Sequence, residues 1–366
     1  MQLSDIYDSV QSGQRLSREE GMFLLQKGDL LELGTLANEI RFKKNPESRV
    51  TFVVDTNPNY TNICNIDCIF CAFYRHSGEE GEYTYTVDYM IQKFKESAAK
   101  GVTTVLLQGG VNPAVPFEYY VEMVERTVKE VPEIAPHFWS TSEIIGMAEI
   151  SGQTVPQVLQ KLWDAGQRSI PGGGAEILSD RVKKKISSKK GTSADWLNVM
   201  RDAHKIGFKS TATMMYGHLE KDEDIVEHLE VIRQLQDEYQ GFTAFVPWSF
   251  KPGNTPLEKI IPHYATANQY YKIIAFSRIY LDNFPHIQAS WFSEGKKAGQ
   301  IALHFGADDF GGTLLEENVH AAANFVNKTN VEECIELIHG AGFSAAQRTT
   351  LYEIKREYAL NEMVAA

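Results

Sequence analysis

Three of the four cysteines of this 366-residue chain lie within eight residues, at Cys64, Cys68 and Cys71, with the spacing C-x3-C-x2-C. Thiolates hold iron–sulfur clusters, and the usual full set of ligands is four. Three thiolates on a four-iron cluster would leave one iron open to a substrate, much as a catalytic zinc keeps an open position. The motif therefore predicts a [4Fe-4S] cluster that takes part in chemistry, with these three cysteines as its ligands.

Two other kinds of site would also use clustered cysteines. A zinc knuckle needs a fourth ligand nearby, and the close candidate is His76, at a spacing that standard zinc pairs do not have. A set of buried structural cysteines is the second alternative. Disulfides are disfavoured, because residues 1–15 are polar and lack the apolar core of a secretion signal. The spacing thus favours an iron–sulfur cluster over both alternatives.

The cysteine spacing resembles that of the radical S-adenosylmethionine (SAM) enzymes. The resemblance implies that the open iron binds the amino and carboxylate groups of SAM. It also implies that one electron cleaves the sulfonium of SAM, which gives methionine and a 5′-deoxyadenosyl radical. An external one-electron donor such as flavodoxin or ferredoxin would supply that electron.

The composition indicates a soluble enzyme of the cytoplasm. The net charge is −12, so no broad basic surface suggests a nucleic-acid partner. No stretch approaches the ~20 consecutive apolar residues of a membrane helix. With 43% hydrophobic residues the chain can bury one large core. A thiolate-bound cluster also fits a reducing compartment.

Short β-branched runs alternate with amphipathic helices from Val50 onward, after a helical extension over residues 1–48. Such alternation indicates a parallel sheet, and eight repeats indicate a closed (β/α)8 barrel of the TIM type. We expect this radical-SAM barrel over residues 49–366, with a final helical region from Glu316 onward and no further domain. The expected strands cover residues 50–55, 103–107, 137–140, 167–170, 210–215, 243–246, 286–289 and, from the weakest pattern, 305–307.

In such barrels the chemistry lies at the carboxyl ends of the strands, so the residues after each strand are candidates. Gln108, Gly109 and Gly110 follow the second strand. Glycines there let a ligand touch the backbone, although a tight turn would use them equally well. In radical SAM enzymes the glycine motif after this strand receives the amino group of SAM, and the resemblance implies the same role here.

Two further pairs of residues are candidates for the SAM site. Ser142 and Glu143 follow the third strand, and the resemblance implies that they bind the ribose hydroxyls of SAM. The alternative is that they cap the next helix. Phe70 and Tyr74 lie where the family places an aromatic side chain near the adenine, although lone aromatics more often pack in the core.

The turns after the fourth and sixth strands are candidates for substrate binding. Three consecutive glycines, Gly172 to Gly174, are costly to order, which indicates that the backbone comes close to a ligand. We take Gly173 and Glu176 as substrate-binding candidates, although Glu176 could instead favour a helix N-terminus. Trp248 follows the sixth strand and offers an aromatic wall for a flat ring.

Longer motifs narrow the resemblance to one family. The chain reads CNIDCIFCAFYR from Cys64, SIPGGGAEIL from Ser169, TATMMYGH from Thr211, FTAFVPWSFKPGN from Phe242 and GADDFGGT from Gly306. Together these resemble the cyclic dehypoxanthinyl futalosine synthases, the cyclases of the futalosine route to menaquinone. The resemblance implies conversion of dehypoxanthine futalosine to cyclic dehypoxanthinylfutalosinate, in which the ribose C4′ loses hydrogen to the adenosyl radical and then bonds to the benzoate ring. Aminofutalosine synthases and deazaflavin-precursor synthases are the alternatives.

That ring closure needs a group for the benzoate carboxylate and a base for the last proton. Arg348 is a candidate clamp, because a guanidinium binds a carboxylate in bidentate fashion. His218 follows the fifth strand and titrates near neutral pH, although a lone histidine is more often structural. Asp308 and Asp309 follow the expected eighth strand, where they could accept the proton or begin a helix. Cys334 lies on an apolar helix face and is expected in the core.

Overall fold

The strand β1 (Arg49–Val53) and its short continuation β2 (Asp55–Thr56) are central to the barrel of the computed structural model, which describes residues 1–360. Strands β2 to β8 pair in chain order and in parallel. On its other side β1 pairs in parallel with β9 (Asp309–Gly312), and β9 meets the chain after β8 at the bridge between Gln288 and Asp309. With β1 and β2 counted as one, the ring has eight parallel strands, which confirms the (β/α)8 barrel. Its other strands are β3 (Thr104–Leu107), β4 (Ala135–Phe138), β5 (Ser169–Ile170), β6 (Lys209–Tyr216), β7 (Phe242–Ser249) and β8 (His286–Ile287).

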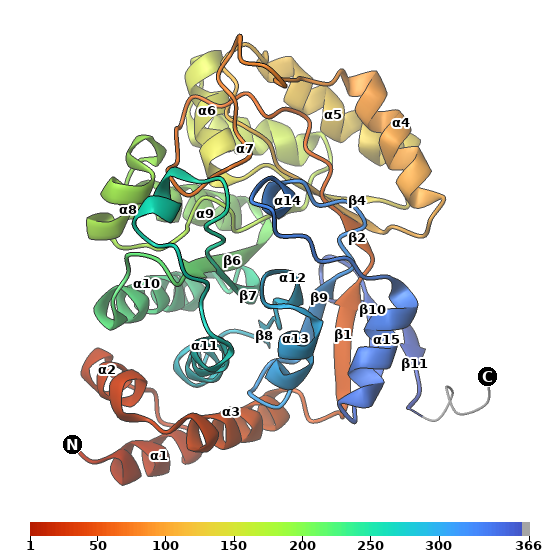
Figure 1. The fold of residues 1–366 in the computed structure, drawn as a ribbon. Helices are drawn as coiled ribbons and strands as arrows, with labels where there is room; N and C mark the ends of the chain where they lie inside the picture. Colours follow the sequence, from red (N-terminus) through yellow and green to blue (C-terminus); the bar gives the residue numbers. More distant parts are fainter. Residues whose placement is uncertain (361–366) are drawn as a thin grey trace.

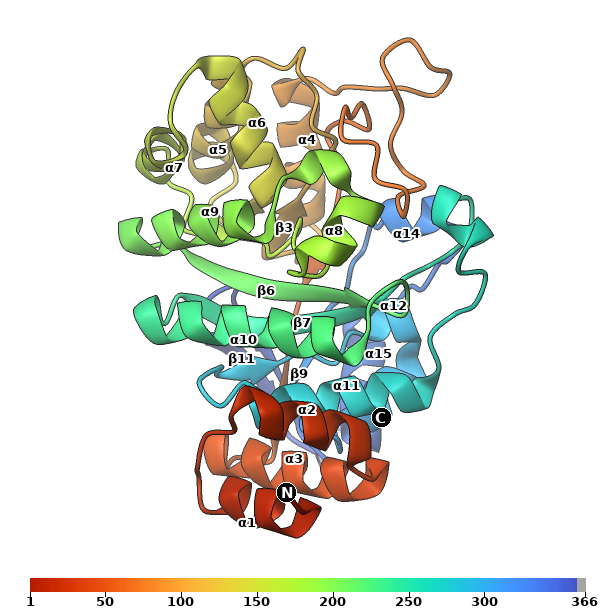
Figure 2. The ribbon, with the colours of Figure 1, turned by 90° about the vertical axis from the view of Figure 1, so that its left-hand side faces the viewer.

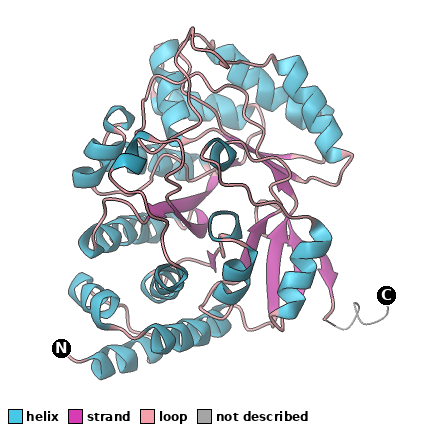
Figure 3. Ribbon diagram, viewed as in Figure 1, coloured by secondary structure: helices cyan, strands magenta, loops and turns pink. Residues whose placement is uncertain are grey.

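Most of the helices between the strands cover the outside of this ring, whereas the short α14 (Val319–Ala322) lies at the cavity (Figures 1 and 3). Several begin at a threonine that accepts a hydrogen bond from a free backbone N–H, as Thr86 and Thr192 do. Apolar residues on one face are then buried against the strands. No helix within residues 1–360 is long and apolar enough to cross a membrane. The helices are α4 (Val87–Ala98), α5 (Phe117–Glu130), α6 (Thr141–Ser151), α7 (Val155–Asp164), α8 (Asp180–Ile186), η1 (Ser188–Lys190), α9 (Ser193–Ile206), α10 (Asp222–Tyr239), η2 (Pro256–Lys259), α11 (Ala267–Tyr280), α12 (Trp291–Glu294), α13 (Lys296–Ala302), α14 (Val319–Ala322) and α15 (Val331–Gly340).

Three helices precede the barrel: α1 (Leu3–Gln11), α2 (Arg18–Lys27) and α3 (Leu30–Lys44). They lie at the end of the barrel opposite the cysteine loop (Figure 2). Ser17 forms the capping box that its sequence predicts for α2. The fully buried guanidinium of Arg41 donates hydrogen bonds to the carbonyls of Asn45, Glu47 and Arg49, which ties α3 to the start of β1.

The carboxyl-terminal part of the chain differs from the sequence-based expectation. The region from Glu316 onward is not all helical, because β10 (Ser344–Arg348) and β11 (Ile354–Tyr358) form a hairpin whose first strand runs parallel to β1. The eighth strand is β9 and not residues 305–307, which form a turn. The β9 sequence DFGG has low strand propensity, and pairing with β1 overrides it. Residues 361–366 of the expected barrel segment lie outside the described residues.

Candidate active site

A cavity of about 350 Å³ lies at the carboxyl ends of the strands. Its lining comes from the cysteine loop between β2 and α4 and from the turns that follow the other strands. Most candidates from the sequence are brought together here, whereas Glu143, His218, Asp308 and Asp309 are not among the lining residues. The candidates that line the cavity are Cys64, Cys68, Phe70, Cys71, Tyr74, Gln108, Gly109, Gly110, Ser142, Gly173, Glu176, Trp248 and Arg348.

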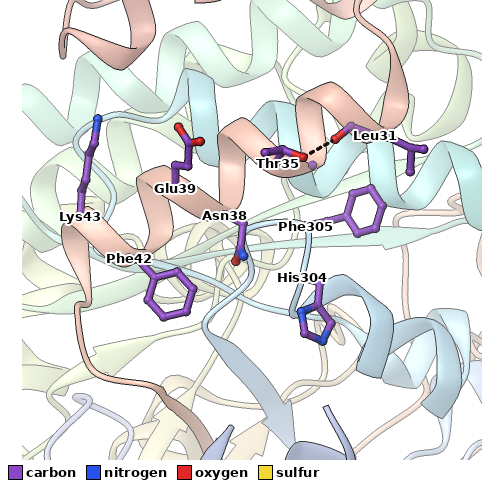
Figure 4. Close-up of a pocket in the computed structure, with 9 residues that line it drawn as sticks. Leu31, Thr35, Asn38, Glu39, Phe42, Lys43, His304 and Phe305 are labelled. Carbon is purple, nitrogen blue, oxygen red and sulfur yellow. Dashed lines mark hydrogen bonds between the residues drawn. The ribbon is translucent and has the colours of Figure 1, made fainter. Parts of the chain in front are cut away.

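A larger and more open hollow, of about 740 Å³, lies between α3 and the turn that follows α13 (Figure 4). Phe42, His304 and Phe305 contribute rings to its wall. None of its nine lining residues is a candidate from the sequence. Chemistry in barrel enzymes occurs at the carboxyl ends of the strands, so the smaller cavity is the candidate active site.

The three cysteines of the motif open into the smaller cavity as free thiols. Their loop is fixed by a hydrogen bond from the backbone N–H of Ile69 to the carbonyl of Ile186 at the end of α8 (2.9 Å). Burial raises the pKa of the Cys68 thiol to about 12 and raises that of Cys71. A bound metal compensates the charge that burial disfavours and deprotonates a coordinating thiol outright. This donor set therefore fits an iron–sulfur cluster.

The geometry gives no support to a zinc knuckle. Within residues 1–360, no three His, Cys, Asp or Glu side chains form a group that could hold one ion. His76, the sequence candidate for a fourth zinc ligand, lies 3.5 Å from Oδ1 of Asp67 and packs edge-on against Tyr74. Cluster thiolates bind separate irons, so the three sulfurs need not converge on one point.

The glycine turns bring neighbouring segments of the cavity wall together. A Cβ on Gly110 would lie 2.1 Å from the carbonyl oxygen of Ile63, in the cysteine loop. A Cβ on Gly173 would lie 2.2 Å from Nε2 of Gln108. The backbone carbonyl at Gly110 leaves no room for a side chain, so a glycine is required there for the turn to pack against the cysteine loop, whereas Gln108 is flexible and could shift away from Gly173. That these two glycine turns bind a ligand stays a prediction.

Glu143 is a helix cap and does not reach the cavity. Its Oε2 accepts hydrogen bonds from the backbone N–H and hydroxyl of Ser140, at 2.7 and 2.6 Å, in the capping box of α6. Its Oε1 accepts from the hydroxyl of Tyr60 and the N–H of Gly109, both at 3.0 Å. Only 2% of the residue is exposed. The structure thus favours the capping alternative, and of the two candidates after the third strand only Ser142 lines the cavity.

Glu176 lines the cavity as half of a buried ion pair. Its Oε1 lies 2.7 Å from Nζ of Lys190, and its Oε2 is buried without a hydrogen-bond partner. Burial disfavours the charge of Lys190, but Cys68 and Glu176 outweigh burial and raise the pKa of its ammonium group. The sequence-based candidates do not include Lys190, which also lines the cavity. The sequence feature that could have indicated Lys190 is the run of basic residues over positions 181–190.

His218 lies behind the cavity wall. Its Nε2 lies 2.9 Å from the carbonyl of Met215, and its Nδ1 lies 3.3 Å from Oε2 of Glu220. The side chain is fully buried. The sequence correctly placed His218 after a strand. The turn after β6, however, directs its ring into the protein, so this histidine is structural, which was the alternative to a catalytic role.

Asp308 and Asp309 lie at the start of β9, because the eighth strand begins later in the chain than expected. Asp308 is paired with Arg278 and His286. Burial opposes its charge, but Arg278 and His286 outweigh burial and lower the pKa of Asp308 to about 2. Asp309 is paired with Arg348. These carboxylates therefore stabilise the barrel interior instead of forming a rim at the cavity mouth.

Arg348 is the last residue of β10 and lines the cavity. Its Nε and Nη2 both donate to the carboxylate of Asp309, and its guanidinium lies 3.9 Å from the ring centre of Tyr352. The bidentate geometry expected for a substrate carboxylate is thus used within the protein. The sequence could not indicate this pairing, because residues 309 and 348 meet only when β9 and β10 flank β1.

Aromatic side chains form one wall of the cavity. Trp248 and Phe292 both line it, and the ring of His320 lies between them, with ring centres at 5.7 and 5.4 Å. Burial lowers the pKa of His320 to about 3, so the imidazole is neutral. This wall offers a largely apolar surface for a flat ligand ring.

Asp55 is a cavity residue that the sequence did not single out. It ends the first strand, 7% exposed, and its Oδ1 accepts a hydrogen bond from the N–H of Leu314 (2.8 Å). Among the described residues, no hydrogen bond to its Oδ2 is found. Burial raises the pKa of Asp55 to about 6, although Arg348 lowers it in part. In the sequence, the position of Asp55 at the end of the first predicted strand could have indicated that it reaches the site.

Comparison with known proteins places the chain in a family. Residues 58–232 match the model of the radical SAM superfamily, and residues 239–361 match that of the CofH/MqnC C-terminal region. A cyclic dehypoxanthine futalosine synthase from Halalkalibacterium halodurans is 39% identical over 98% of this chain and 96% of that protein. An aminodeoxyfutalosine synthase from Thermus thermophilus is 36% identical over 96% of this chain and 95% of its own length.

A third relative and one solved structure complete the comparison. A 5-amino-6-(D-ribitylamino)uracil–L-tyrosine 4-hydroxyphenyl transferase from Methanosarcina barkeri is 40% identical over 97% of this chain and 94% of its own. The crystal structure of methylornithine synthase superposes with a TM-score of 0.71 at 18% identity, over 92% of this chain and 96% of that one. This likeness supports the fold alone.

Family and geometry agree on the cofactors. Radical SAM enzymes use a [4Fe-4S] cluster and SAM, and the three free thiols at the cavity fit the cluster. Both family models and the full-length relatives identify the same kind of enzyme. The chain therefore belongs to the radical SAM enzymes and, within them, to the family that includes the futalosine synthases.

Proposed function

We propose that this enzyme converts dehypoxanthine futalosine to cyclic dehypoxanthinylfutalosinate. In this reaction the 5′-deoxyadenosyl radical takes the C4′ hydrogen of the ribose, and C4′ then bonds to the benzoate ring. Loss of one proton, and of one electron that would return to the oxidised cluster, restores the aromatic ring, so SAM is consumed as the net oxidant. The observation that carries the proposal is the full-length similarity, at 39% and 38% identity, to two relatives named cyclic dehypoxanthine futalosine synthase.

In this proposal Cys64, Cys68 and Cys71 hold the cluster, which supplies the electron that cleaves SAM. The turn Gln108 to Gly110 holds the amino group of SAM, and Ser142 lies beside its ribose. Phe70 and Tyr74 pack near the adenine. These assignments follow the family pattern and agree with the position of each residue on the cavity wall.

The substrate occupies the remaining part of the cavity. Trp248, with the neutral ring of His320 beside it, packs against the benzoate. Gly173 lets the backbone approach the ligand. Walls that exclude water would protect a carbon radical from side reactions. Glu176 and Arg348 contribute through their pairing with Lys190 and Asp309, which fixes charge on the cavity wall.

We propose Asp55 as the acceptor of the last proton. A general base must reach the substrate, and Asp55 lines the cavity whereas His218, Asp308 and Asp309 do not. Its Oδ2 is the oxygen left for that role. With its pKa raised to about 6, the carboxyl group is ionised at neutral pH and close to the optimum for a base.

The test is anaerobic reconstitution with iron and sulfide, followed by SAM, dithionite and dehypoxanthine futalosine. Mass spectrometry should detect 5′-deoxyadenosine together with a product that has two hydrogen atoms fewer than the substrate. Deuterium placed at C4′ should appear in 5′-deoxyadenosine, or in SAM if the radical returns. Cleavage of SAM without any cyclised product would reject the proposal.

The same assay separates the other candidate functions. The relatives include an aminodeoxyfutalosine synthase at 36% identity and a hydroxyphenyl transferase at 40% identity. An aminofutalosine synthase would add the adenosyl radical to an enol ether, so the adenosyl group would appear in the product. A transferase of the deazaflavin-precursor type would consume tyrosine with 5-amino-6-(D-ribitylamino)uracil. Turnover of one of these substrate sets, and not of dehypoxanthine futalosine, would select that alternative.

A further inference from the structure

A basic segment lies beside the cysteine loop of this acidic protein. Residues 181–190 read RVKKKISSKK, with six Lys or Arg and no Asp or Glu, in a chain of net charge −12. The segment forms α8 and η1, at the end of the barrel that carries the cysteine loop (Figure 2). Arg181, Lys184, Lys185 and Lys189 are exposed there.

The segment contacts the cysteine motif directly. The carbonyl of Ile186 accepts the hydrogen bond from Ile69, which lies between the second and third cysteines. Lys189 forms an ion pair with Asp67, the residue before Cys68. Lys190 turns inward to the cavity. The basic surface and the cluster ligands are thus parts of one packed unit.

Two of the exposed lysines form no ion pair within residues 1–360. Arg181 is paired with Asp224, and Lys189 with Asp67. Among the described residues, no carboxylate lies within ion-pair distance of Lys184 or Lys185. Exposed like charges that are adjacent and uncompensated repel each other, and a partner of opposite charge relieves that repulsion.

We propose that the face formed by Lys184, Lys185 and Lys189 is the docking surface for an acidic protein that carries a single electron. The inference rests on the proposed function to this extent: SAM cleavage consumes one electron that the chain does not contain. Each transfer oxidises the carrier by one electron, and that electron would reduce the cluster that the three cysteines hold. A carrier bound here would meet the loop of these cysteines, so the charge and the site of electron entry coincide on one surface.

The test is the charge-reversing variant Lys184→Glu/Lys185→Glu. An acidic flavodoxin is the probe. Stopped-flow absorbance should show that reduced flavodoxin reduces the reconstituted cluster about tenfold or more slowly in the variant at low salt. The difference should shrink at high salt, because exposed charges are screened. Binding of oxidised flavodoxin, measured by calorimetry, should weaken in parallel.

The control variant Lys27→Glu/Lys100→Glu makes the same charge change at the other end of the barrel, on two exposed lysines. It should bind flavodoxin and be reduced as the unaltered enzyme is. Dithionite-driven SAM cleavage should be equal in all three proteins, which separates carrier docking from the chemistry. The result of dithionite assays with dehypoxanthine futalosine bears on the proposed function alone.

Two outcomes would overturn the proposal. One is equal flavodoxin binding and reduction in Lys184→Glu/Lys185→Glu and the unaltered enzyme, or an equal loss in the control. The other is loss of binding to phosphatidylglycerol vesicles with no change in reduction by flavodoxin. That second result would assign the basic face to a lipid surface instead.

Discussion

The buried carboxylates at the start of β9 and the buried carboxylate of Asp55 at the cavity differ in how many of their oxygens have hydrogen-bond or ion-pair partners. At the start of β9, Asp308 has Arg278 and His286 as partners, and Asp309 has Arg348 and Thr51. At the carboxyl end of the first strand, Asp55 accepts one hydrogen bond from Leu314. The contrast also appears in titration, because the pKa of Asp308 is lowered to about 2 whereas that of Asp55 is raised to about 6.

This difference in the number of partners distinguishes carboxylates that stabilise the fold from a carboxylate that can react with a ligand. A buried carboxylate with every oxygen paired has no capacity left for a ligand, and removing its partner destabilises the protein. A buried carboxylate with an open oxygen has lost hydration without full replacement, and such groups concentrate at functional sites. Cavity position and hydrogen-bond satisfaction together therefore select Asp55 over Asp308 and Asp309.

The largest effect is expected at the cysteines. Cys64→Ala, Cys68→Ala and Cys71→Ala should each abolish SAM cleavage, because each removes one of three cluster ligands. Iron content and 5′-deoxyadenosine formation are the measurements. Cys334→Ala is the matched control, since Cys334 is fully buried on α15 and should leave both unchanged. Iron loss in that control would overturn the ligand assignment.

The next effect concerns the open carboxylate. Asp55→Asn should slow release of cyclised product by about 10²–10⁴-fold while 5′-deoxyadenosine still forms. In the unaltered enzyme the rate should rise with pH through about 6, as Asp55 ionises, and this rise should vanish in the variant. Cyclisation at the unaltered rate in Asp55→Asn would mean that the proton leaves by another route.

Asp308→Asn should act on stability and not on chemistry. Breaking a buried ion pair costs about 3–5 kcal/mol, which denaturant unfolding of the apo protein would measure. The pKa of Asp308 is lowered in the folded state, so its stabilisation is present above the ordinary pKa of 3.8 and is lost as pH falls toward about 2. If the Asp308→Asn variant folds with unaltered stability, cleaves SAM and fails to cyclise the substrate, the structural role assigned to Asp308 would be wrong and Asp308 would be the base.

The smallest effect is expected at Glu143. Glu143→Gln should leave SAM affinity unchanged and lower the free energy of unfolding by about 1–3 kcal/mol, because it disturbs a buried capping box. Burial raises the pKa of Glu143 to about 7, so the folded protein holds this proton more tightly than the unfolded chain does. Stability should therefore fall as pH rises from about 4.5 to 7, and the variant should lose this dependence. A tenfold loss of SAM affinity would return Glu143 to the ligand site.

The sequence by itself determined the features that depend on local pattern. The cysteine spacing, the glycine turns and the alternation of strand and helix are set by neighbours in the chain. They were sufficient to predict the barrel and to select residues that line the cavity, such as Phe70, Gln108 and Trp248, whereas the assignment of the three cysteines as cluster ligands stays a prediction. Residues after correctly assigned strands mostly reached the site, because a barrel places all strand ends on one rim.

Only the tertiary structure decided which charged groups are free. Whether Arg348 can bind a ligand depends on Asp309, and the two meet only because β9 and β10 both pair with β1, which lies 258 residues before Asp309 and still farther before Arg348. His218 follows a strand as Asp55 does, yet its turn points inward. Pairing and orientation depend on long-range packing, which residue types and spacings do not encode locally. The open oxygen of Asp55 and the partners of the cavity charges therefore became visible only in the folded chain.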